Sequence, residues 1–236
     1  MKLKNKVIVI TGASDGIGKQ ISLRLAREGT RLALVARDEK RLKEVSEKAK
    51  ELGAIDTKTY SCDVRQTKEL EKTAKSIISD FNGIDVLVND AGIWQKIMTV
   101  EKIEKEVVDE VIETNLTALI HITRMFLPNL KSRKEAAIIN VVSKSGVVAQ
   151  EGQSVYTASK YGARGFTEVL KADLRGTNVR VAGVYQSGTN TKMFEKAGEE
   201  NVPTEKFTNP ADLADVVAYM LSLPEKIWLH DVRVEY

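Results

Sequence analysis

The chain has 236 residues, of which 42% are hydrophobic and 29% are charged, a composition typical of globular proteins and not of disordered ones. Its 36 basic and 33 acidic residues give a net charge of +3, so the charge balance does not indicate a nucleic-acid partner. A single cysteine, Cys62, excludes an intramolecular disulfide framework and favours a cytoplasmic location. Two histidines disfavour a metal site, and no apolar run is long enough for a membrane helix.

Short apolar runs alternate with longer amphipathic stretches along the whole chain. The runs predict strands buried on both faces, and the amphipathic stretches predict helices. The expected strands are Val7–Ile10, Arg31–Ala36, Ile55–Ser61, Ile84–Val88, Ala136–Val142, Asn178–Val184 and Trp228–Val234. The expected helices are Ile17–Glu28, Glu39–Leu52, Thr67–Phe81, Val100–Leu127, Val155–Leu174 and Ala211–Leu221. This alternation predicts a doubly wound α/β Rossmann fold, with about seven parallel strands and helices on both faces of the sheet.

No composition shift, repeat or linker divides the sequence, so we expect residues 1–236 to form a single Rossmann domain. The longest irregular stretch covers residues 185–208 and is rich in Gly, Thr, Asn and Glu. A loop of this length inside a compact domain is usually functional, and we expect this one to cover a substrate.

A glycine-rich turn follows the first expected strand and opens the first expected helix. Its sequence is TGASDGIG, with glycines at Gly12, Gly16 and Gly18. Glycines at such a turn let the backbone approach a ligand closely, and the start of the helix offers unpaired N–H groups to a pyrophosphate. The turn therefore predicts a dinucleotide site, with a plain strand-to-helix turn as the alternative.

Five motifs in chain order resemble those of the short-chain dehydrogenase/reductase family. The turn matches TGxxxGIG, and the NDAG that follows the fourth expected strand is similar to NNAG. Asn115 and Ser143 stand where the family carries an asparagine and a serine, and Tyr156 with Lys160 matches YxxxK. The resemblance covers nearly the whole chain. It implies an oxidoreductase that transfers a hydride to interconvert a ketone or aldehyde and an alcohol.

Tyr156 and Lys160 are four residues apart and therefore share one face of a predicted helix. A nearby ammonium lowers the pKa of a phenol, which would suit Tyr156 to general acid/base chemistry. Ser143 ends a buried strand at the sheet edge where ligands bind, and its hydroxyl could hold a carbonyl oxygen. The resemblance implies that Asn115 bends its helix and binds a relay water. The spacing alone is equally compatible with a catalytic pair and with a Tyr and a Lys that merely lie on a solvated helix face.

The end of the second expected strand bears on the choice between NAD and NADP. Ala36 stands where the NAD-specific aspartate of the family would be, and Arg37 follows it as in NADP-preferring members. Asp38 is the competing NAD signal, and Asp15 puts a carboxylate where some NADP enzymes carry a base. Ser14 could still donate to a 2′-phosphate. We predict NADP, with NAD as the less favoured cofactor.

The resemblance implies further cofactor and substrate contacts. The cofactor-binding residues expected are Gly12, Ser14, Asp15, Gly16, Ile17, Gly18, Arg37, Asp63, Val64, Asn89, Ala91, Gly92, Tyr156, Lys160, Thr189 and Thr191. The substrate-binding residues expected are Trp94, Ser143, Tyr156 and Met193. Gln186-Ser187 replaces the Pro-Gly that the family places beside the nicotinamide.

The sequence ends soon after the last expected strand, which resembles the compact carbonyl, hydroxy-acid and sepiapterin-type reductases more than the ketoacyl-carrier-protein reductases. The family resemblance implies a small carbonyl or alcohol substrate and a homodimer or homotetramer, with neither a nucleic-acid nor a membrane partner. A catalytically weak nucleotide-binding regulator is the main alternative, supported by Gln186-Ser187. A sugar-nucleotide epimerase with the same Tyr–Lys pair is disfavoured by the short chain and the glycine spacing.

Overall fold

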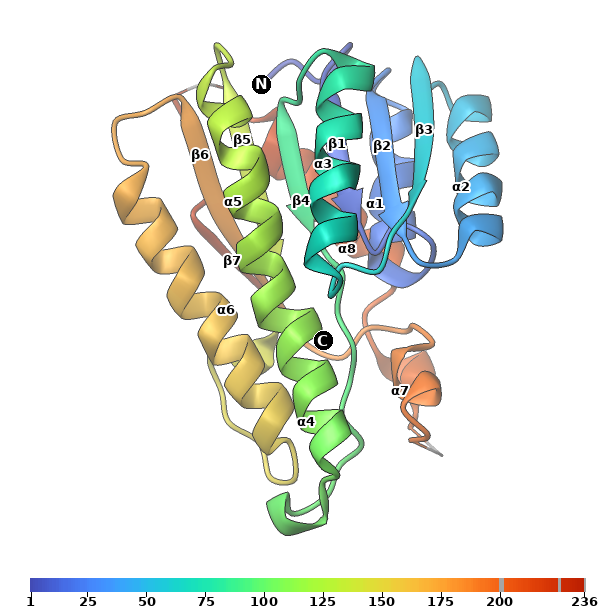
Figure 1. Ribbon diagram of the computed structural model, residues 1–236, viewed down its shortest axis with the longest axis vertical. Helices are drawn as coiled ribbons and strands as arrows, with labels where there is room; N and C mark the ends of the chain where they lie inside the picture. Colours follow the sequence, from blue (N-terminus) through green and yellow to red (C-terminus); the bar gives the residue numbers. More distant parts are fainter. Residues whose placement is uncertain (200–201, 225, 236) are drawn as a thin grey trace.

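Seven parallel strands form one sheet in the order β3-β2-β1-β4-β5-β6-β7 in a computed structural model of the chain (Figure 1). The structure describes residues 1–199, 202–224 and 226–235. The strands are β1 Val7–Thr11, β2 Arg31–Ala36, β3 Asp56–Ser61, β4 Val86–Asn89, β5 Ala136–Val141, β6 Val179–Gln186 and β7 Asp231–Val234. The chain winds outward from β1 to β3, then crosses back to β4 and proceeds to β7. The predicted doubly wound fold is therefore confirmed.

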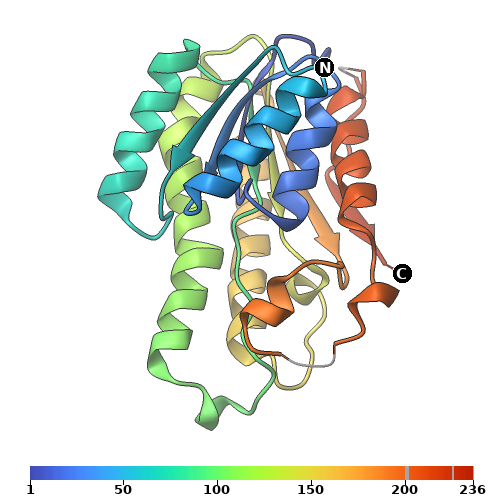
Figure 2. The same ribbon diagram turned by 90° about the vertical axis from the view of Figure 1, so that its right-hand side faces the viewer.

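Helices cover both faces of the sheet, as Figures 1 and 2 show. On one face lie α1 Gly16–Ala26, α2 Glu39–Glu51 and α8 Pro210–Ser222. On the other lie α3 Thr67–Phe81, α5 Ala118–Lys131 and α6 Ser154–Asp173. Two shorter helices, α4 Lys105–Ile112 and α7 Met193–Lys196, lie beyond the carboxyl edge of the sheet. In the described part of the chain, no helix combines the length and the apolar character needed to cross a lipid bilayer.

Two apolar cores form because successive strand residues point to opposite faces of the sheet. In β1, Ile8 and Ile10 pack toward α1 and α8, whereas Val7 and Val9 pack toward α3 and α5. Both faces of the strand are therefore buried, which explains its continuous apolar sequence. The rigid sheet holds the loops at its carboxyl edge in fixed relative positions.

Two predicted elements were wrong in extent. The helix expected over Val100–Leu127 is a 3₁₀ turn at Val100–Lys102, then α4, a π-helical turn at Glu113–Thr117, and α5, which runs past Pro128 to Lys131. Pro128 does not end α5, because the residues around it are packed into the core, including the fully buried Leu130. The strand expected from Trp228 begins only at Asp231; Trp228 instead donates its indole N–H to the Val181 carbonyl at 2.8 Å.

The stretch predicted as the substrate loop, residues 185–208, is more ordered than its composition suggests. It includes the end of β6, helix α7, a 3₁₀ turn at Thr204–Lys206 and a bridge between Thr189 and Thr208. Residues 200 and 201 of that stretch, like residue 236 of the predicted domain, lie outside the described residues.

Candidate active site

A cavity of about 1170 Å³ lies at the carboxyl edge of the sheet. Its walls come from residues that follow or end five different strands, namely Gly12, Arg37, Asp63, Gly92 and Ser143, and from the 186–199 segment. In a doubly wound sheet, ligands bind outside the carboxyl ends of the strands where the strand order reverses, here between β1 and β4. The cavity is at that place and is larger than most small-molecule pockets.

The glycine turn brings its backbone against the loop after β4. Gly12 has φ +70°, a conformation that glycine adopts readily, and a side chain on Gly12 would press on the Ala91 backbone at 3.1 Å. A side chain on Gly18 would lie 2.6 Å from the Gly12 carbonyl oxygen. Thr11 ties the two loops together, because its hydroxyl oxygen accepts the N–H groups of Asp90 and Ala91 at 3.1 Å each. This close approach leaves the start of α1 facing the cavity.

Asp15 is not the free carboxylate that the sequence suggested. It caps α1 by accepting the Gly16 N–H at 2.8 Å, and it accepts from Lys196 at 2.8 Å and from Arg41 at 3.2 Å. Partial burial raises the pKa of Asp15, but the Lys196 and Gly16 hydrogen bonds and both cations outweigh it, so the pKa lies below its ordinary value. Its charge is thus balanced, which removes much of the expected repulsion toward a phosphate.

The acidic group at the end of β2 is paired with a basic one, and a further arginine faces the cavity, an arrangement that favours binding of a phosphate. Asp38 caps α2 through the Arg41 N–H at 3.0 Å and pairs with the Arg41 guanidinium at 3.3 Å, so it is already engaged. Arg37 is exposed beside it and lines the cavity. Farther along, Asp63 pairs with Arg65 at 2.7 Å, and this hydrogen bond holds the pKa of Asp63 low. Arg41 was missed from the sequence because the turn of α2, not a motif, brings it to the site.

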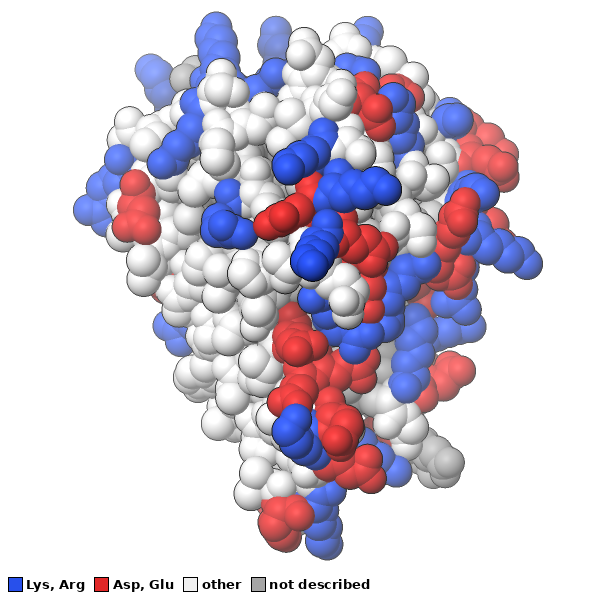
Figure 3. Space-filling model, in the orientation of Figure 1, with Lys and Arg blue, Asp and Glu red and all other residues white. Residues whose placement is uncertain are grey.

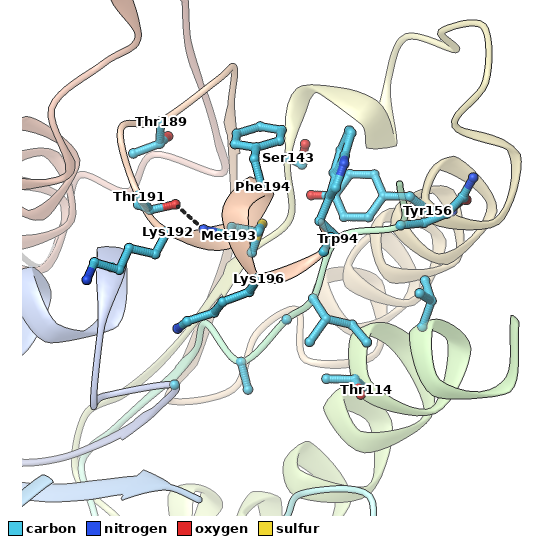
Figure 4. A pocket seen from close by; sticks show the side chains of 18 of the residues that line it. Trp94, Thr114, Ser143, Tyr156, Thr189, Thr191, Lys192, Met193, Phe194 and Lys196 are labelled. Carbon is cyan, nitrogen blue, oxygen red and sulfur yellow. Dashed lines mark hydrogen bonds between the residues drawn. The ribbon is translucent and has the colours of Figure 1, made fainter. Parts of the chain in front are cut away.

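Tyr156, Ser143 and Lys160 meet in the cavity (Figure 4). The Tyr156 phenol is buried beside Ser143, and the Lys160 ammonium lies 5.6 Å from the centre of the phenol ring. Burial raises the pKa of Tyr156 to about 12, although the nearby Ser143 hydroxyl opposes the rise. Burial also lowers the pKa of Lys160 to about 8, against the charge of Asp90. The predicted lowering of the Tyr156 pKa is therefore absent in the protein alone, because burial outweighs the opposing effect of the Ser143 hydroxyl.

Ser143 itself stands just beyond β5 in an unusual backbone conformation. Its φ is +124° and its ψ is 153°, a region that residues with a side chain rarely adopt. Its hydroxyl oxygen accepts the Ser145 N–H at 3.1 Å. Figure 4 shows the Ser143 hydroxyl and the Tyr156 phenol pointing toward the same space.

Asn115 lies in the π-helical turn Glu113–Thr117 between α4 and α5. Its side-chain oxygen accepts the Ile93 N–H at 2.8 Å, and its amide donates to the Ile93 carbonyl at 3.0 Å and to Ser159 at 3.1 Å. A side chain on Gly92 would lie 3.3 Å from the Asn115 oxygen and 3.6 Å from the Lys160 nitrogen. Asn115 thus holds the loop that passes beside Lys160.

Three of the predicted residues do not line the cavity: Gly18, Asn89 and Asn115. The Asn89 side chain points into the core, where its amide donates to Asn140 at 2.9 Å and to Thr123 at 3.2 Å. The remaining predicted cofactor and substrate residues do line it.

The end of β6 offers polar atoms that have no protein partner among the described residues. The Gln186 side-chain oxygen and the Ser187 hydroxyl are both buried and unpaired, and both residues line the cavity. Thr189 and Thr191 follow on the same wall. Since buried polar atoms are nearly always hydrogen-bonded, these atoms and the close-packed glycine turn fit a polar ligand such as a dinucleotide.

Aromatic rings enclose the space in front of Tyr156. The Trp94 ring centre lies 4.4 Å from the Tyr156 ring centre and 5.0 Å from that of Phe194 (Figure 4). The Phe194 ring centre in turn lies 5.7 Å from that of Phe207. Met193, from α7, adds to the same wall. Phe207 was not predicted, because only the fold of the 189–208 segment brings it beside Phe194.

Comparisons with known proteins agree with this geometry. The model of the family described as short chain dehydrogenase matches residues 6–202. The 3-oxoacyl-(acyl-carrier-protein) reductase FabG of Thermotoga maritima is 32% identical over 94% of this chain and 92% of its own length. An alcohol dehydrogenase of the archaeon Thermococcus sibiricus, complexed with 5-hydroxy-NADP, superposes with a TM-score of 0.90 at 27% identity, over 98% of this chain and 96% of that one. An actinorhodin polyketide ketoreductase with NADPH superposes with a TM-score of 0.86 at 28% identity, over 98% of this chain and 95% of that one. The chain therefore belongs to the short-chain dehydrogenase family of oxidoreductases.

Proposed function

We propose that this protein is an NADP-dependent carbonyl reductase, interconverting a ketone or aldehyde and an alcohol with Tyr156 as the general acid/base. The observation that carries the proposal is the buried Tyr156 phenol, which lies beside Ser143 inside the cavity at the strand ends, with the Lys160 ammonium 5.6 Å from the centre of its ring. Buried titratable groups with shifted pKa values in such a crevice favour a catalytic role. A bound reduced nicotinamide supplies the hydride to the carbonyl carbon.

Each residue of the group has a distinct role in the proposal. Ser143 holds the carbonyl oxygen, and Tyr156 donates its phenol proton to that oxygen during reduction and takes it back during oxidation. Lys160 favours the phenolate and binds the nicotinamide ribose. Asn115 holds the loop after β4 in place, which supports its predicted part in a proton relay.

NADP is the cofactor that the charged groups favour. Arg37 lines the cavity, and Arg41 is near enough to Asp15 to bind it, so two guanidinium groups can serve a 2′-phosphate. Asp38, the group that would have favoured NAD, is engaged as a helix cap. The solved relatives with NADP or NADPH support the same choice. Gln186 and Ser187 would then pair their buried atoms with the nicotinamide end.

The substrate in this proposal is a small carbonyl compound. The Trp94, Met193 and Phe194 side chains favour an apolar group beside the reacting carbonyl. By their names, the similar proteins act on different substrates, which are ketoacyl groups for two of them and an alcohol for another. Simple carbonyl and hydroxy-acid compounds remain the substrates that we predict.

The assembly and location follow as further proposals. We infer one domain over residues 1–236 that pairs as a homodimer or homotetramer through α5 and α6. Figure 3 shows few charged side chains over α6 and the adjoining part of α5, and Tyr161 and Val169 of α6 are exposed there. Cys62 is buried and forms no disulfide, which is consistent with the predicted cytoplasmic location.

Two measurements test the proposed function. NADPH and NADH oxidation with diketones, aldehydes and keto acids should show turnover with NADPH and much weaker turnover with NADH. Tyr156→Phe should bind NADPH normally but lose at least a hundredfold in kcat, because its ring remains and its proton is gone. NADPH binding without turnover of any of these substrates would favour the nucleotide-binding regulator, and near-normal turnover by Tyr156→Phe would refute the role of the phenol.

A further inference from the structure

The loop that follows β4 carries a buried amide, Gln95, that no sequence motif indicated. Gln95 is only 1% exposed. Its side-chain oxygen accepts the backbone N–H groups of Val155 and Tyr156, each at 3.0 Å. Its amide nitrogen donates to the carbonyl oxygens of Gly152 at 3.0 Å and Lys96 at 3.2 Å. One side chain thus joins this loop to the first turn of α6 and to the segment leading into it.

Gln95 does for α6 what an N-cap side chain does for most helices. The first N–H groups of a helix have no partner within the helix and usually bond a side chain at the N-cap. In α6 the N-cap residue is Gln153, whose side chain bonds Ser145 and Gln150 instead. The acceptor for α6 comes from a residue 60 positions before Val155. The start of α6 is therefore fixed by a loop that lines the cavity.

The residues just before Gln95 contact the same site. Asn115 bonds both backbone groups of Ile93, at 2.8 and 3.0 Å. The Trp94 ring lies 4.4 Å from the Tyr156 ring. Residues 93–95 therefore contact in turn the π-helical turn, the phenol ring, and the backbone of the residue that bears the phenol.

We propose that Gln95 is a positioning residue for the proton transfer that the proposed function assigns to Tyr156, and the inference rests on that function. Gln95 fixes the Tyr156 backbone, and with it the place of the phenol oxygen relative to Ser143 and Lys160. It exchanges no proton itself; the O–H bond that breaks is that of Tyr156, and the bond that forms is on the carbonyl oxygen. A shift of about 1 Å in a reacting group can reduce a rate roughly a hundredfold, so freeing this turn affects chemistry before binding.

The charge of the side chain at this position also matters. A glutamate at position 95 could accept the same two N–H groups but could not donate to Gly152 or Lys96. At the alkaline pH where the Tyr156-dependent limb is measured, this carboxyl group is ionised. A negative charge this close to Tyr156 would raise the pKa of the phenol further. A role in supporting the fold alone would not produce such a change.

The experiment compares Gln95→Leu and Gln95→Glu with Asn178→Leu as a matched control. Asn178 is also an amide that bridges backbone groups, donating to Leu130 at 2.9 Å and Arg133 at 2.7 Å, but at the opposite edge of the sheet. We expect Gln95→Leu to lower kcat at least tenfold with the KM for NADPH changed less than about threefold. Gln95→Glu should move the Tyr156-dependent limb of the pH–rate profile to higher pH. Asn178→Leu should lower the Tm and leave kcat and the profile unchanged.

The outcomes separate this inference from the proposed function. Wild-type kcat and pH profile in both Gln95 variants, beside an inactive Tyr156→Phe, would overturn the positioning role. An active Tyr156→Phe would overturn the proposed function instead. Should Gln95→Leu fail to fold, Gln95→Glu decides the question, because it keeps both bonds to the helix and its profile either shifts or does not.

Discussion

Ser143 combines the chemical role that we propose for it with a backbone conformation that residues bearing a side chain rarely adopt. A residue with a side chain at φ +124° is strained by the order of 1–3 kcal/mol, and such strain persists only where neighbouring structure enforces it. Here the backbone of β5 and the Ser145 N–H enforce it, and the result is a hydroxyl aimed at the Tyr156 phenol.

The strain predicts an unusual order of stability among variants. Ser143→Gly should be more stable than Ser143→Ala by about 1 kcal/mol in the free energy of unfolding, because glycine alone accepts this φ without strain. Both variants should lose at least tenfold in kcat, since both lack the hydroxyl that holds the carbonyl oxygen. Thermal melts and steady-state rates measure the two effects. Equal melting temperatures would contradict the strain.

Asp90 puts a carboxyl group where the family motif has an amide. Burial raises the pKa of Asp90 to about 7, although the Lys160 charge and the Gly18 N–H oppose the rise. When Asp90 is ionised, its charge raises the pKa of both Lys160 and Tyr156. The carboxyl therefore titrates near neutral pH beside the groups that the mechanism uses.

Asp90→Asn should shift the pH dependence of the reaction toward acid. Without the carboxylate, the pKa of Lys160 and that of Tyr156 both fall, so the limb governed by Tyr156 moves to lower pH by roughly one unit. The pH profiles of alcohol oxidation for the two proteins test this. Asp80→Asn, on the exposed bond between Tyr60 and Asp80, is the control and should leave the profile in place. A shift toward alkali would mean that Asp90 acts otherwise.

At the scale of elements, α7 is tied across the cavity to the glycine turn. Lys196, its last residue, bonds Asp15, the N-cap of α1, and the Thr191 methyl group lies 3.4 Å from where a side chain on Gly16 would begin. A half-exposed ion pair between Lys196 and Asp15 thus connects α7 to the start of α1. Such pairs contribute only about 0.2–1 kcal/mol and weaken with salt.

Removing this ion pair should loosen α7 without unfolding the protein. For Lys196→Met we expect an almost unchanged Tm and amide exchange in residues 189–199 that is up to roughly fivefold faster, the equivalent of at most about 1 kcal/mol. Lys48→Met, which removes the exposed Lys48–Glu51 pair on α2, should not affect that exchange. Hydrogen exchange followed by mass spectrometry makes the comparison. Unchanged exchange near α7 in Lys196→Met would show that other contacts hold it.

At the scale of the whole molecule, α6 presents a small apolar strip, formed by Tyr161 and Val169, on the outside of the sheet layer. Val169 is 60% exposed and Tyr161 is 42% exposed along α6. Apolar side chains of this size on a helix face favour association with a second copy. The proposed homodimer or homotetramer would bury them.

A charge placed in this strip should weaken the assembly. We expect the wild-type protein to have the mass of a dimer or tetramer by light scattering, and Val169→Arg to dissociate to a smaller species, because a buried unpaired cation is costly. Ile55→Arg carries the same charge at the opposite edge of the sheet, where Ile55 is 50% exposed, and should not change the mass. A monomeric wild type, or dissociation by Ile55→Arg as well, would contradict the proposed interface.

Local patterns in the sequence were sufficient for most elements of this fold. Continuous apolar runs such as Arg31–Ala36 specify strands buried on both faces, and the NPAD at 209–212 specifies the start of α8 through its cap and first-turn proline. The local patterns gave the wrong helix bounds between residues 100 and 131. There, buried side chains around Pro128 outweigh the tendency of proline to interrupt a helix.

The sequence by itself determined the family, the alternation of parallel strands with helices, and most of the predicted side chains that line the cavity at the strand ends, because all of these depend on spacing along the chain. Only the tertiary structure decided the charge state of the site and its supports. It buries Tyr156. It pairs Asp15 with Lys196, 181 positions apart, and it bonds Gln95 to Val155 of α6, 60 positions apart. The energies of those contacts depend on which groups share a solvent-excluded space, and local sequence does not contain that information.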